Sequence, residues 1–477
     1  MDIRKNQVLL LICFLALCLL SCAQPPVIMT GSIKENLAFP GAEGFGRHVT
    51  GGRGGRVMIV SNLDNDGPGS FRAAAEAKGP RVIVFSVSGT IHLTKSISIR
   101  GDATIAGQTA PGDGICIADY PVTLGGDNII VRYMRFRMGD RYQDKGKVNG
   151  SGSDDAFGGV KRNRIIVDHC SMSWSTDEVC SIYAGDSVTL QWNIISEPLN
   201  YSYHFEKGDK DYERHGYGGI WGGQHASFHH NLFAHCNSRT PRFDGIRNAK
   251  VENCDFRNNV IYNWGTNNVY AGEGGTYNIV NNYYKWGPST NNKIRNRVAN
   301  PFKRSPDIPF GKFYIDGNYV DGDADVTSDN WRGVTMNEGT VDDARAAKLP
   351  APFPTEPVYT HSATQAYSVV LMHAGATSPV RDSLDQRIVN DVKNRTGHLI
   401  DVQGGYPHGT PYELTIKAWP TLKSLPAPLD TDQDGMPDDW ERQHKLNPNN
   451  ASDASANTLH KHYTNIEMYI NGRVKLF

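Results

Sequence analysis

Short strands that end in a polar residue, most often asparagine, recur along most of this chain of 477 residues. Each strand mixes Val, Ile or aromatic residues with polar ones and is followed at once by another short strand, as in residues 128–136, 187–195 and 313–320. Aligned at the polar position, the repeats have corners at Met134, Cys170, Asn193, Asn231, Asn259, Asn282 and Asn318. The gaps between these corners are 36, 23, 38, 28, 23 and 36 residues.

These gaps suit a coil of stacked turns. A gap of 23 residues accommodates three short strands, and the longer gaps fit the same turn with an added loop. Asparagines at equivalent corners can hydrogen-bond along the stack. The pattern therefore predicts an all-β chain folded as a right-handed parallel β-helix over residues 38–340. An Asn-rich β-sandwich is the alternative, whereas a β-propeller would need a steadier period and hairpin signals.

The charge balance restricts the class of partner. Lys plus Arg is 49 and Asp plus Glu is 50, which gives a net charge of −1. A neutral chain of this kind is not a general nucleic-acid or membrane-surface binder, so we expect no nucleic-acid partner. The 49 glycines predict many turns and disfavour a bundle of long helices.

The first residues resemble an export signal. Arg4 and Lys5 precede an apolar run at residues 9–20, which is too short to span a membrane comfortably. Leu19-Leu20-Ser21-Cys22 resembles a bacterial lipobox, in which residues 1–21 are removed and Cys22 is lipidated. We expect an exported outer-membrane lipoprotein, monomeric and attached to the membrane only by its lipid. An ordinary signal peptide with an incidental cysteine is the alternative.

The remaining segments give the domain organisation. Residues 22–37 read as a polar tether, residues 341–425 as an extension that packs on the coil, and residues 426–477 as a last small module. Within the extension, apolar residues at spacing four predict one helix over residues 383–396, with Gly397 as its stop. The five cysteines outside the leader have neither disulfide nor zinc spacing, so we expect them to be buried as small apolar side chains.

The last module opens with an acidic loop that matches an EF-hand loop position by position. Asp430, Asp432, Asp434 and Asp438 occupy positions 1, 3, 5 and 9, Gly435 occupies position 6, and Glu441 occupies position 12. The carbonyl group of Met436 would supply the ligand at position 7. The loop predicts a structural Ca²⁺ site, and an acidic surface turn is the alternative.

A second group of carboxylates lies within the repeats, at Asp154, Asp155, Asp168, Asp177 and Glu178. Their spacing can bring carboxylates from adjacent turns to one face, where they repel each other unless a cation lies between them. Two hypotheses follow: a Ca²⁺ site or the acid–base pair of a glycosidase. Asp168 precedes His169 inside an apolar strand, which favours a structural corner. Glu178 is expected to point away from Asp177 if that segment is extended.

Several motifs together resemble the pectate lyases of polysaccharide lyase family 1. They are Asp168-His169-Cys170-Ser171, Arg239-Thr240-Pro241, and the glycine-rich stretches at residues 42–55 and 61–72. The resemblance covers about residues 38–325, and the whole arrangement, with Gly219-Ile220-Trp221-Gly222 and the C-terminal loop, is similar to pectin-degrading lipoproteins of gut Bacteroidetes. That family has the parallel β-helix fold and cleaves α-1,4-polygalacturonate by β-elimination with Ca²⁺.

The resemblance assigns roles to individual residues. It implies that Asp155 and Asp177, with Asp154 beside them, bind Ca²⁺, that Arg239 removes the C5 proton, and that Arg242 binds carboxylates of the pectic substrate. The family's lysine before the Gly-Ile-Trp-Gly stretch is replaced here, with His215 and Tyr217 nearby as substrate-binding candidates.

This sequence also departs from the family pattern. Ser181 and Asp244 stand where the family has a further aspartate and a second arginine. Three alternatives to a pectate lyase stay open. They are a lyase acting on methyl-esterified pectin or a rhamnogalacturonan, a β-helix glycoside hydrolase, and a non-catalytic binder.

Overall fold

The computed structural model describes residues 36–474, and residues Leu37–Val474 form one compact unit. The predicted signal at residues 1–21, Cys22 and most of the tether lie outside the described residues. The predicted boundaries at 340 and 425 stay predictions. No described helix is both long and apolar enough to cross a membrane.

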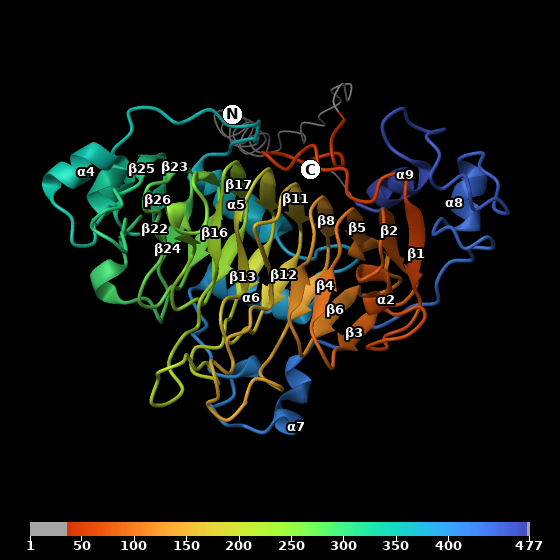
Figure 1. Cartoon of the computed structure of the whole chain (residues 1–477), viewed down its shortest axis with the longest axis horizontal. Coiled ribbons are helices and arrows are strands. Elements are labelled where there is room, and N and C mark those ends of the chain that lie inside the picture. The colour runs from red at the N-terminus through yellow and green to blue at the C-terminus, as the bar shows by residue number, and fades with distance from the viewer. Residues whose placement is uncertain (1–35, 475–477) are drawn as a thin grey trace, which may run out of the picture. The chain divides into compact units, whose positions relative to one another are not determined.

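Three parallel sheets wind around a common apolar interior (Figure 1). The ten-stranded sheet contains β1 (Arg56–Val60), β2 (Arg81–Phe85), β5 (Ala103–Ala106), β8 (Ile129–Arg132), β11 (Ile165–Asp168), β14 (Val188–Gln191), β17 (Ala226–His229), β20 (Asn253–Arg257), β23 (Thr276–Val280) and β25 (Lys312–Asp316). The nine-stranded sheet contains β3 (Gly89–His92), β6 (Ile115–Ala118), β9 (Arg135–Arg137), β12 (Ser171–Ser173), β15 (Ile194–Ser196), β18 (Leu232–Ala234), β21 (Val260–Tyr262), β24 (Tyr283–Lys285) and β26 (Tyr319–Val320).

The third sheet has seven strands and carries the candidate site. It contains β4 (Ile97–Ile99), β7 (Val122–Leu124), β10 (Phe157–Val160), β13 (Cys180–Gly185), β16 (Ile220–Gly223), β19 (Arg242–Phe243) and β22 (Tyr270–Ala271). Each strand pairs in parallel with the strand one turn away, as a coil requires. The predicted parallel β-helix is therefore confirmed.

The predicted asparagine corners form a continuous ladder. The side-chain oxygens of Asn231, Asn259, Asn282 and Asn318 each accept the backbone N–H of the preceding corner at 2.9 Å. Asn330 of η4 (Asn330–Gly333) closes the ladder by accepting the N–H of Asn318 at 2.8 Å. These buried polar groups are satisfied by one another, which is why the same residue type recurs.

The helices and turns cover the ends and outer faces of the coil. They are α2 (Phe71–Ala75), α3 (Ala324–Ser328), α4 (Val341–Ala347), α5 (Ala363–His373), α6 (Ser383–Asn394), α7 (Tyr412–Thr415), α8 (Asp438–Gln443) and α9 (Asn465–Gly472). The short 3₁₀ turns are η1 (Gly107–Thr109), η2 (Gly245–Arg247), η3 (Asn292–Ile294), η4, η5 (Gln403–Gly405) and η6 (Ile416–Ala418).

Helices α5 and α6 pack on the outer face of the nine-stranded sheet. In β18, Phe233 points into the coil, while Leu232 and Ala234 point outward and contact these helices. The α6 helix confirms the expected helix at residues 383–396, although it ends at Asn394 because Arg395 takes a left-handed conformation. Ion pairs from the buried Arg137 to Asp382 and Asp385 hold α6 on the sheet.

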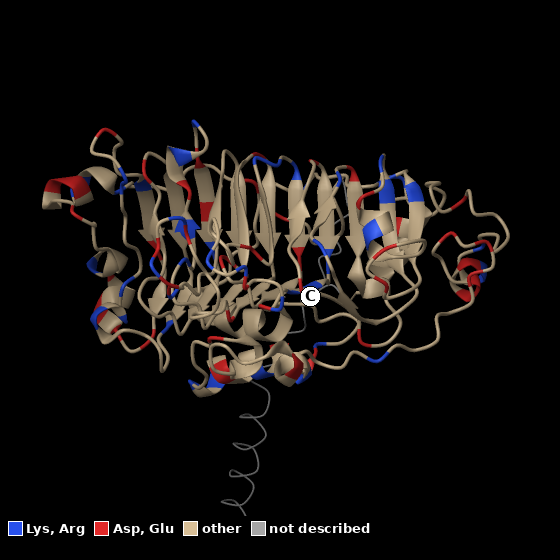
Figure 2. Cartoon of the chain, turned by 60° about the horizontal axis from the view of Figure 1, so that its bottom comes forward, with Lys and Arg blue, Asp and Glu red and all other residues tan. Residues whose placement is uncertain are grey.

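The seven-stranded sheet keeps exposed outward positions, among them Ser98 and Thr123. Charged residues lie mainly in the turns, and the strands of the coil consist largely of uncharged residues (Figure 2). The five cysteines outside the leader are free and buried, as expected: Cys116, Cys170, Cys180, Cys236 and Cys254.

Candidate functional site

The candidate residues lie just before the start of four neighbouring strands of the seven-stranded sheet. Asp155 precedes β10, Asp177 precedes β13, Tyr217 precedes β16 and Arg239 precedes β19. Parallel bridges join Glu178 to Tyr217 and Tyr217 to Ser238, so the segments before these strands lie side by side. We call the row of Asp155, Asp177, Tyr217 and Arg239 the column. The fold thus brings residues together that are far apart in the sequence.

Close packing of the turns supports this column. Gly158 of β10 pairs with Ser181 of β13, and a Cβ atom at Gly158 would lie 2.4 Å from the Ser181 carbonyl oxygen. Only glycine permits that approach. The Ser181 hydroxyl accepts the Ile220 N–H at 3.1 Å and hydrogen-bonds to Asp155. At this position, where the resemblance implies a further aspartate, the chain has the neutral hydroxyl of Ser181.

Three carboxylates form the centre of the site. One oxygen each of Asp155, Asp177 and Glu178 lies within 4.8 Å of the others. The Glu178 N–H donates to Asp155 Oδ1 at 3.0 Å. Burial, followed by the nearby Asp177, raises the pKa of Asp155 well above its ordinary value. Such a group needs a cation or a proton to offset its repulsion.

Arg239 lies beside this group. Its guanidinium forms an ion pair with Glu178 and lies over the Tyr217 ring, 4.4 Å from the ring centroid. Arg239 has a left-handed backbone (φ 57°), which is uncommon for a residue with a side chain and occurs often at functional sites. Its side chain is 18% exposed, so it is partly accessible to a ligand.

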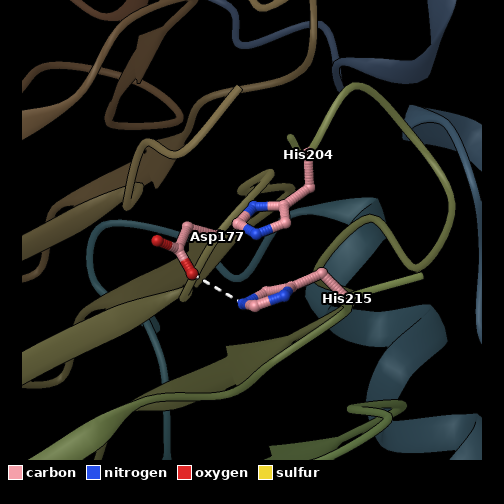
Figure 3. A group of neighbouring side chains, drawn as sticks. All are labelled: Asp177, His204 and His215. Carbon is pink, nitrogen blue, oxygen red and sulfur yellow. Dashed lines mark ion pairs between the residues drawn. The ribbon is translucent and has the colours of Figure 1, made fainter. Parts of the chain in front are cut away.

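Two histidines, His204 and His215, lie next to Asp177 (Figure 3). His215 Nε2 lies 2.6 Å from Asp177 Oδ1, and the His204 ring stacks on His215 with centroids 3.8 Å apart. Although burial opposes ionisation, His215 lowers the pKa of Asp177. The buried His204 also has acidic neighbours, since its Nε2 lies 3.5 Å from Glu213 Oε1.

The donor atoms fit two kinds of metal ion. Asp155, Asp177 and Glu178 offer only oxygens, which suit a hard cation such as Ca²⁺. Asp177, His204 and His215 also lie within 4.8 Å of one another, and imidazole nitrogens suit a transition metal. Because both sets use Asp177, the two ions would compete for it.

Three expected roles need correction. Asp154 turns away from the carboxylate group, because its Oδ2 accepts from Gln143 at 3.0 Å and lies 3.7 Å from Lys145 Nζ. Glu178 does not point away, since a bend at Asp177 breaks the alternation of an extended strand. His215 is 4% exposed beneath Tyr217, so it positions Asp177 and has little surface for a substrate.

The structure also disagrees with the predicted substrate-binding role of Arg242. It is 2% exposed, pairs with the buried Glu273 at 3.3 Å and donates to the Phe243 carbonyl at 2.8 Å. With every guanidinium contact inside the protein, Arg242 has a structural role instead of the expected substrate-binding role.

Asp168 is structural, in agreement with the sequence interpretation. It is fully buried and accepts from Arg132 Nε at 2.8 Å and from Gln191 Nε2 at 2.9 Å. Burial alone would raise the pKa of Asp168, but His169 and Arg132 outweigh it and hold that pKa below the usual range.

The C-terminal loop brings together most of its expected ligands. One oxygen each of Asp430, Asp432 and Asp434 lies within 4.8 Å of the others, and Asp434 forms a second such group with Glu441 and Asp453. Asp438 belongs to neither group, so its expected role as a ligand stays a prediction. Burial and the neighbouring carboxylates raise the pKa of Asp434 to about 8 and that of Glu441 to about 7. The expected role of the Met436 carbonyl as a ligand stays a prediction, and the side chain of this residue is fully buried.

Sequence reasoning missed His204 and Asp453. Both lie in loops with neither strand periodicity nor motif spacing, so nothing in their local sequence indicates which side chains they meet. The isolated position of Asp453, 12 residues after Glu441, could be interpreted only once the fold of the module was known.

The chain is similar to known proteins over almost its whole length, although no family model matches it. It is 35% identical over 461 residues to "Probable pectate lyase C" of Aspergillus fumigatus, covering 93% of this chain and 95% of that protein. A protein of the same name from Aspergillus oryzae is 34% identical over 458 residues, with coverage of 92% and 94%. Among solved structures, a pectate lyase bound to hexasaccharide has 13% identity and a TM-score of 0.49, covering 73% of this chain and 100% of that one.

Proposed function

Because the chain belongs to the pectate lyase family, and is thus a polysaccharide lyase, we propose that it cleaves α-1,4-linked polygalacturonate by Ca²⁺-dependent β-elimination. The products would be oligogalacturonides with a 4,5-unsaturated end. One observation carries the proposal: Arg239, just before β19, lies against the carboxylate group formed by Asp155, Asp177 and Glu178, just before β10 and β13 of the same sheet.

The residues of the column divide the chemistry between them. Bound Ca²⁺, held by Asp155 and Asp177, would neutralise the substrate carboxylate and acidify the C5 proton. Arg239 takes that proton, and the electron pair of the C5–H bond forms the C4–C5 double bond. The bond from C4 to the leaving oxygen breaks, and that oxygen keeps the bonding electrons and takes a proton from solvent. Since Arg239 must be neutral to accept the proton, its ion pair with Glu178 has to loosen first.

Glu178 lies between Arg239 and the acidic group and contacts both. Its carboxylate pairs with Arg239 and also belongs to the acidic group. A Ca²⁺ ion bound by the acidic group would compete with Arg239 for the Glu178 carboxylate and so weaken that ion pair. The Arg239 guanidinium lies over the ring of Tyr217, which is half-buried and therefore partly accessible to a sugar.

The assay is ultraviolet absorbance of the unsaturated product during digestion of polygalacturonate, with Ca²⁺ and with a chelator. We expect Arg239→Ala to lower the rate by about 10²–10⁴-fold, the usual contribution of a positioned acid or base. Arg100→Ala, a change at an exposed arginine just after β4, is the matched control and should stay within about twofold of the wild type.

The same digest distinguishes the alternatives. The oxygens of Asp155 and Asp177 are close enough for the carboxylate pair of a retaining glycosidase. New reducing ends without a rise in absorbance would therefore mean hydrolysis and would refute the proposal. A rise only with methyl-esterified pectin or a rhamnogalacturonan would keep the elimination chemistry and change the substrate.

We also propose that Cys22 carries the lipid that holds this enzyme, as a monomer, at the outer membrane. The support is the lipobox-like sequence before Cys22. Cys22→Ser should move the enzyme from the membrane fraction to the soluble fraction. Equal membrane recovery of both proteins would show that the anchor lies elsewhere.

A further inference from the structure

The acidic loop of the last module contains buried oxygens that lack partners. Both oxygens of Asp432, both of Glu441, Oδ2 of Asp434 and Oδ1 of Asp453 are buried without a hydrogen bond. Glu441 is 0% exposed. A buried carboxylate without a donor is costly, because a charge removed from water needs a compensating charge or hydrogen bonds.

We propose that these oxygens bind one structural Ca²⁺ ion, that Asp453 is a ligand in place of Asp438, and that the ion holds the last module on the first strands of the coil. The ligand set is Asp430, Asp432, Asp434, Glu441 and Asp453. All donors are carboxylate oxygens, and Ca²⁺ takes six to eight such ligands in flexible geometry.

Asp438 already has other partners. Its two oxygens accept the Thr431 N–H and hydroxyl, each at 2.8 Å, and a third contact comes from Arg442 at 2.9 Å. These bonds tie the start of the loop to α8 and leave Asp438 outside the acidic group. The Asp453 Oδ2 accepts the Asn447 N–H at 3.3 Å, whereas its Oδ1 is buried without a hydrogen bond. One oxygen of Asp453 lies within 4.8 Å of oxygens of Glu441 and Asp434.

The loop rests directly on the coil. Gly435 has φ 89°, and a Cβ atom there would lie 2.9 Å from Val57 and 3.0 Å from Val84, on β1 and β2. The adjacent Met436 side chain packs with Val82 and Val84. Folding the loop around an ion therefore also places these two residues against the sheet.

A second contact joins the module to the same end of the coil. Arg53 Nε donates to both oxygens of Glu467 on α9, at 2.9 and 3.1 Å. Ile466 and Ile470 of this helix lie in the same apolar cluster as Met436. Figure 1 shows α8 and α9 beside β1 and β2.

The test measures Ca²⁺ binding to the full-length protein and to three variants by equilibrium dialysis. We expect Glu441→Gln and Asp453→Asn each to bind one equivalent fewer than the wild type at a Ca²⁺ concentration that saturates it. Asp438→Asn should bind the wild-type number. Asp439→Asn, at a neighbouring position with a side chain that is 89% exposed, is the matched control.

Hydrogen exchange locates the effect and does not depend on enzyme activity. Ca²⁺ should slow exchange in residues 430–474 and in β1 and β2 of the wild type, and should leave these segments unchanged in Asp453→Asn. Polygalacturonate cleavage by Asp453→Asn at low temperature should equal that of the wild type. Loss of an equivalent in Asp438→Asn but not in Asp453→Asn would overturn the ligand assignment, and unchanged exchange in β1 and β2 would overturn the coupling.

Discussion

Removing one rung of the asparagine ladder should destabilise the coil strongly. Asn231 is fully buried, and its Oδ1 accepts both the N–H and the Nδ2 of Asn193 at 2.9 Å. Its Nδ2 donates to the Leu190 carbonyl at 2.9 Å and to Asn259 Oδ1 at 3.0 Å. Asn231→Ala therefore removes four hydrogen bonds from the middle of the stack.

The cost follows from what each partner retains. The Asn193 N–H is left buried without an acceptor, which costs about 1–3 kcal/mol. The other three bonds contribute about 1 kcal/mol each, and less where the partner keeps a second bond, as Asn193 Nδ2 does with the Val167 carbonyl. We expect a total loss of about 3–5 kcal/mol in the free energy of unfolding.

Equilibrium urea unfolding of wild type and variant measures this loss from the shift in midpoint. Asn449→Ala, which changes an exposed asparagine in the last module, is the control and should stay within about 0.5 kcal/mol of the wild type. A loss of less than about 1 kcal/mol in the free energy of unfolding of Asn231→Ala would show that the ladder contributes little to the stability of the coil.

Two further predictions concern buried charges. Burial raises the pKa of Glu43 from 4.5 to about 7, so folding stability should fall as pH rises through that range. The free energy of unfolding of Glu43→Gln should equal that of the wild type near pH 4.5 and exceed it by about 3 kcal/mol at pH 8. The same difference in free energy at both pH values would contradict this prediction. Arg242→Met leaves Glu273 buried and unpaired, and should cost about 3–5 kcal/mol of stability without changing KM for polygalacturonate. A raised KM at unchanged stability would restore its substrate-binding role.

The sequence was sufficient to predict the coil because each turn repeats the same physical requirement. A corner residue must satisfy the N–H of the preceding corner, and asparagine does so at 23-residue or longer gaps. Asn330 escaped this reasoning because it follows Asn318 by only 12 residues and lies on η4, where no strand signal precedes it.

The site could be predicted only in part. The resemblance pointed to Asp155, Asp177 and Arg239, and the column brings all three together. Partners contributed by loops could not be predicted, since a loop side chain meets neighbours that no local pattern specifies. The burial of Arg242 depends on Glu273, 31 residues later, which is visible only after the turns are stacked.

The position of the last module has a consequence for the order in which the chain can fold. Val57, Val82 and Val84 face outward from the first strands and are covered by Met436, Ile466 and Ile470, which follow more than 300 residues later. During synthesis from the N-terminus, these first turns therefore remain uncovered until almost the whole chain has emerged. A protein truncated before residue 430 would keep that apolar surface permanently exposed, beside the edge strand β1. The last module thus covers the apolar surface of the first strands, and its removal should favour aggregation.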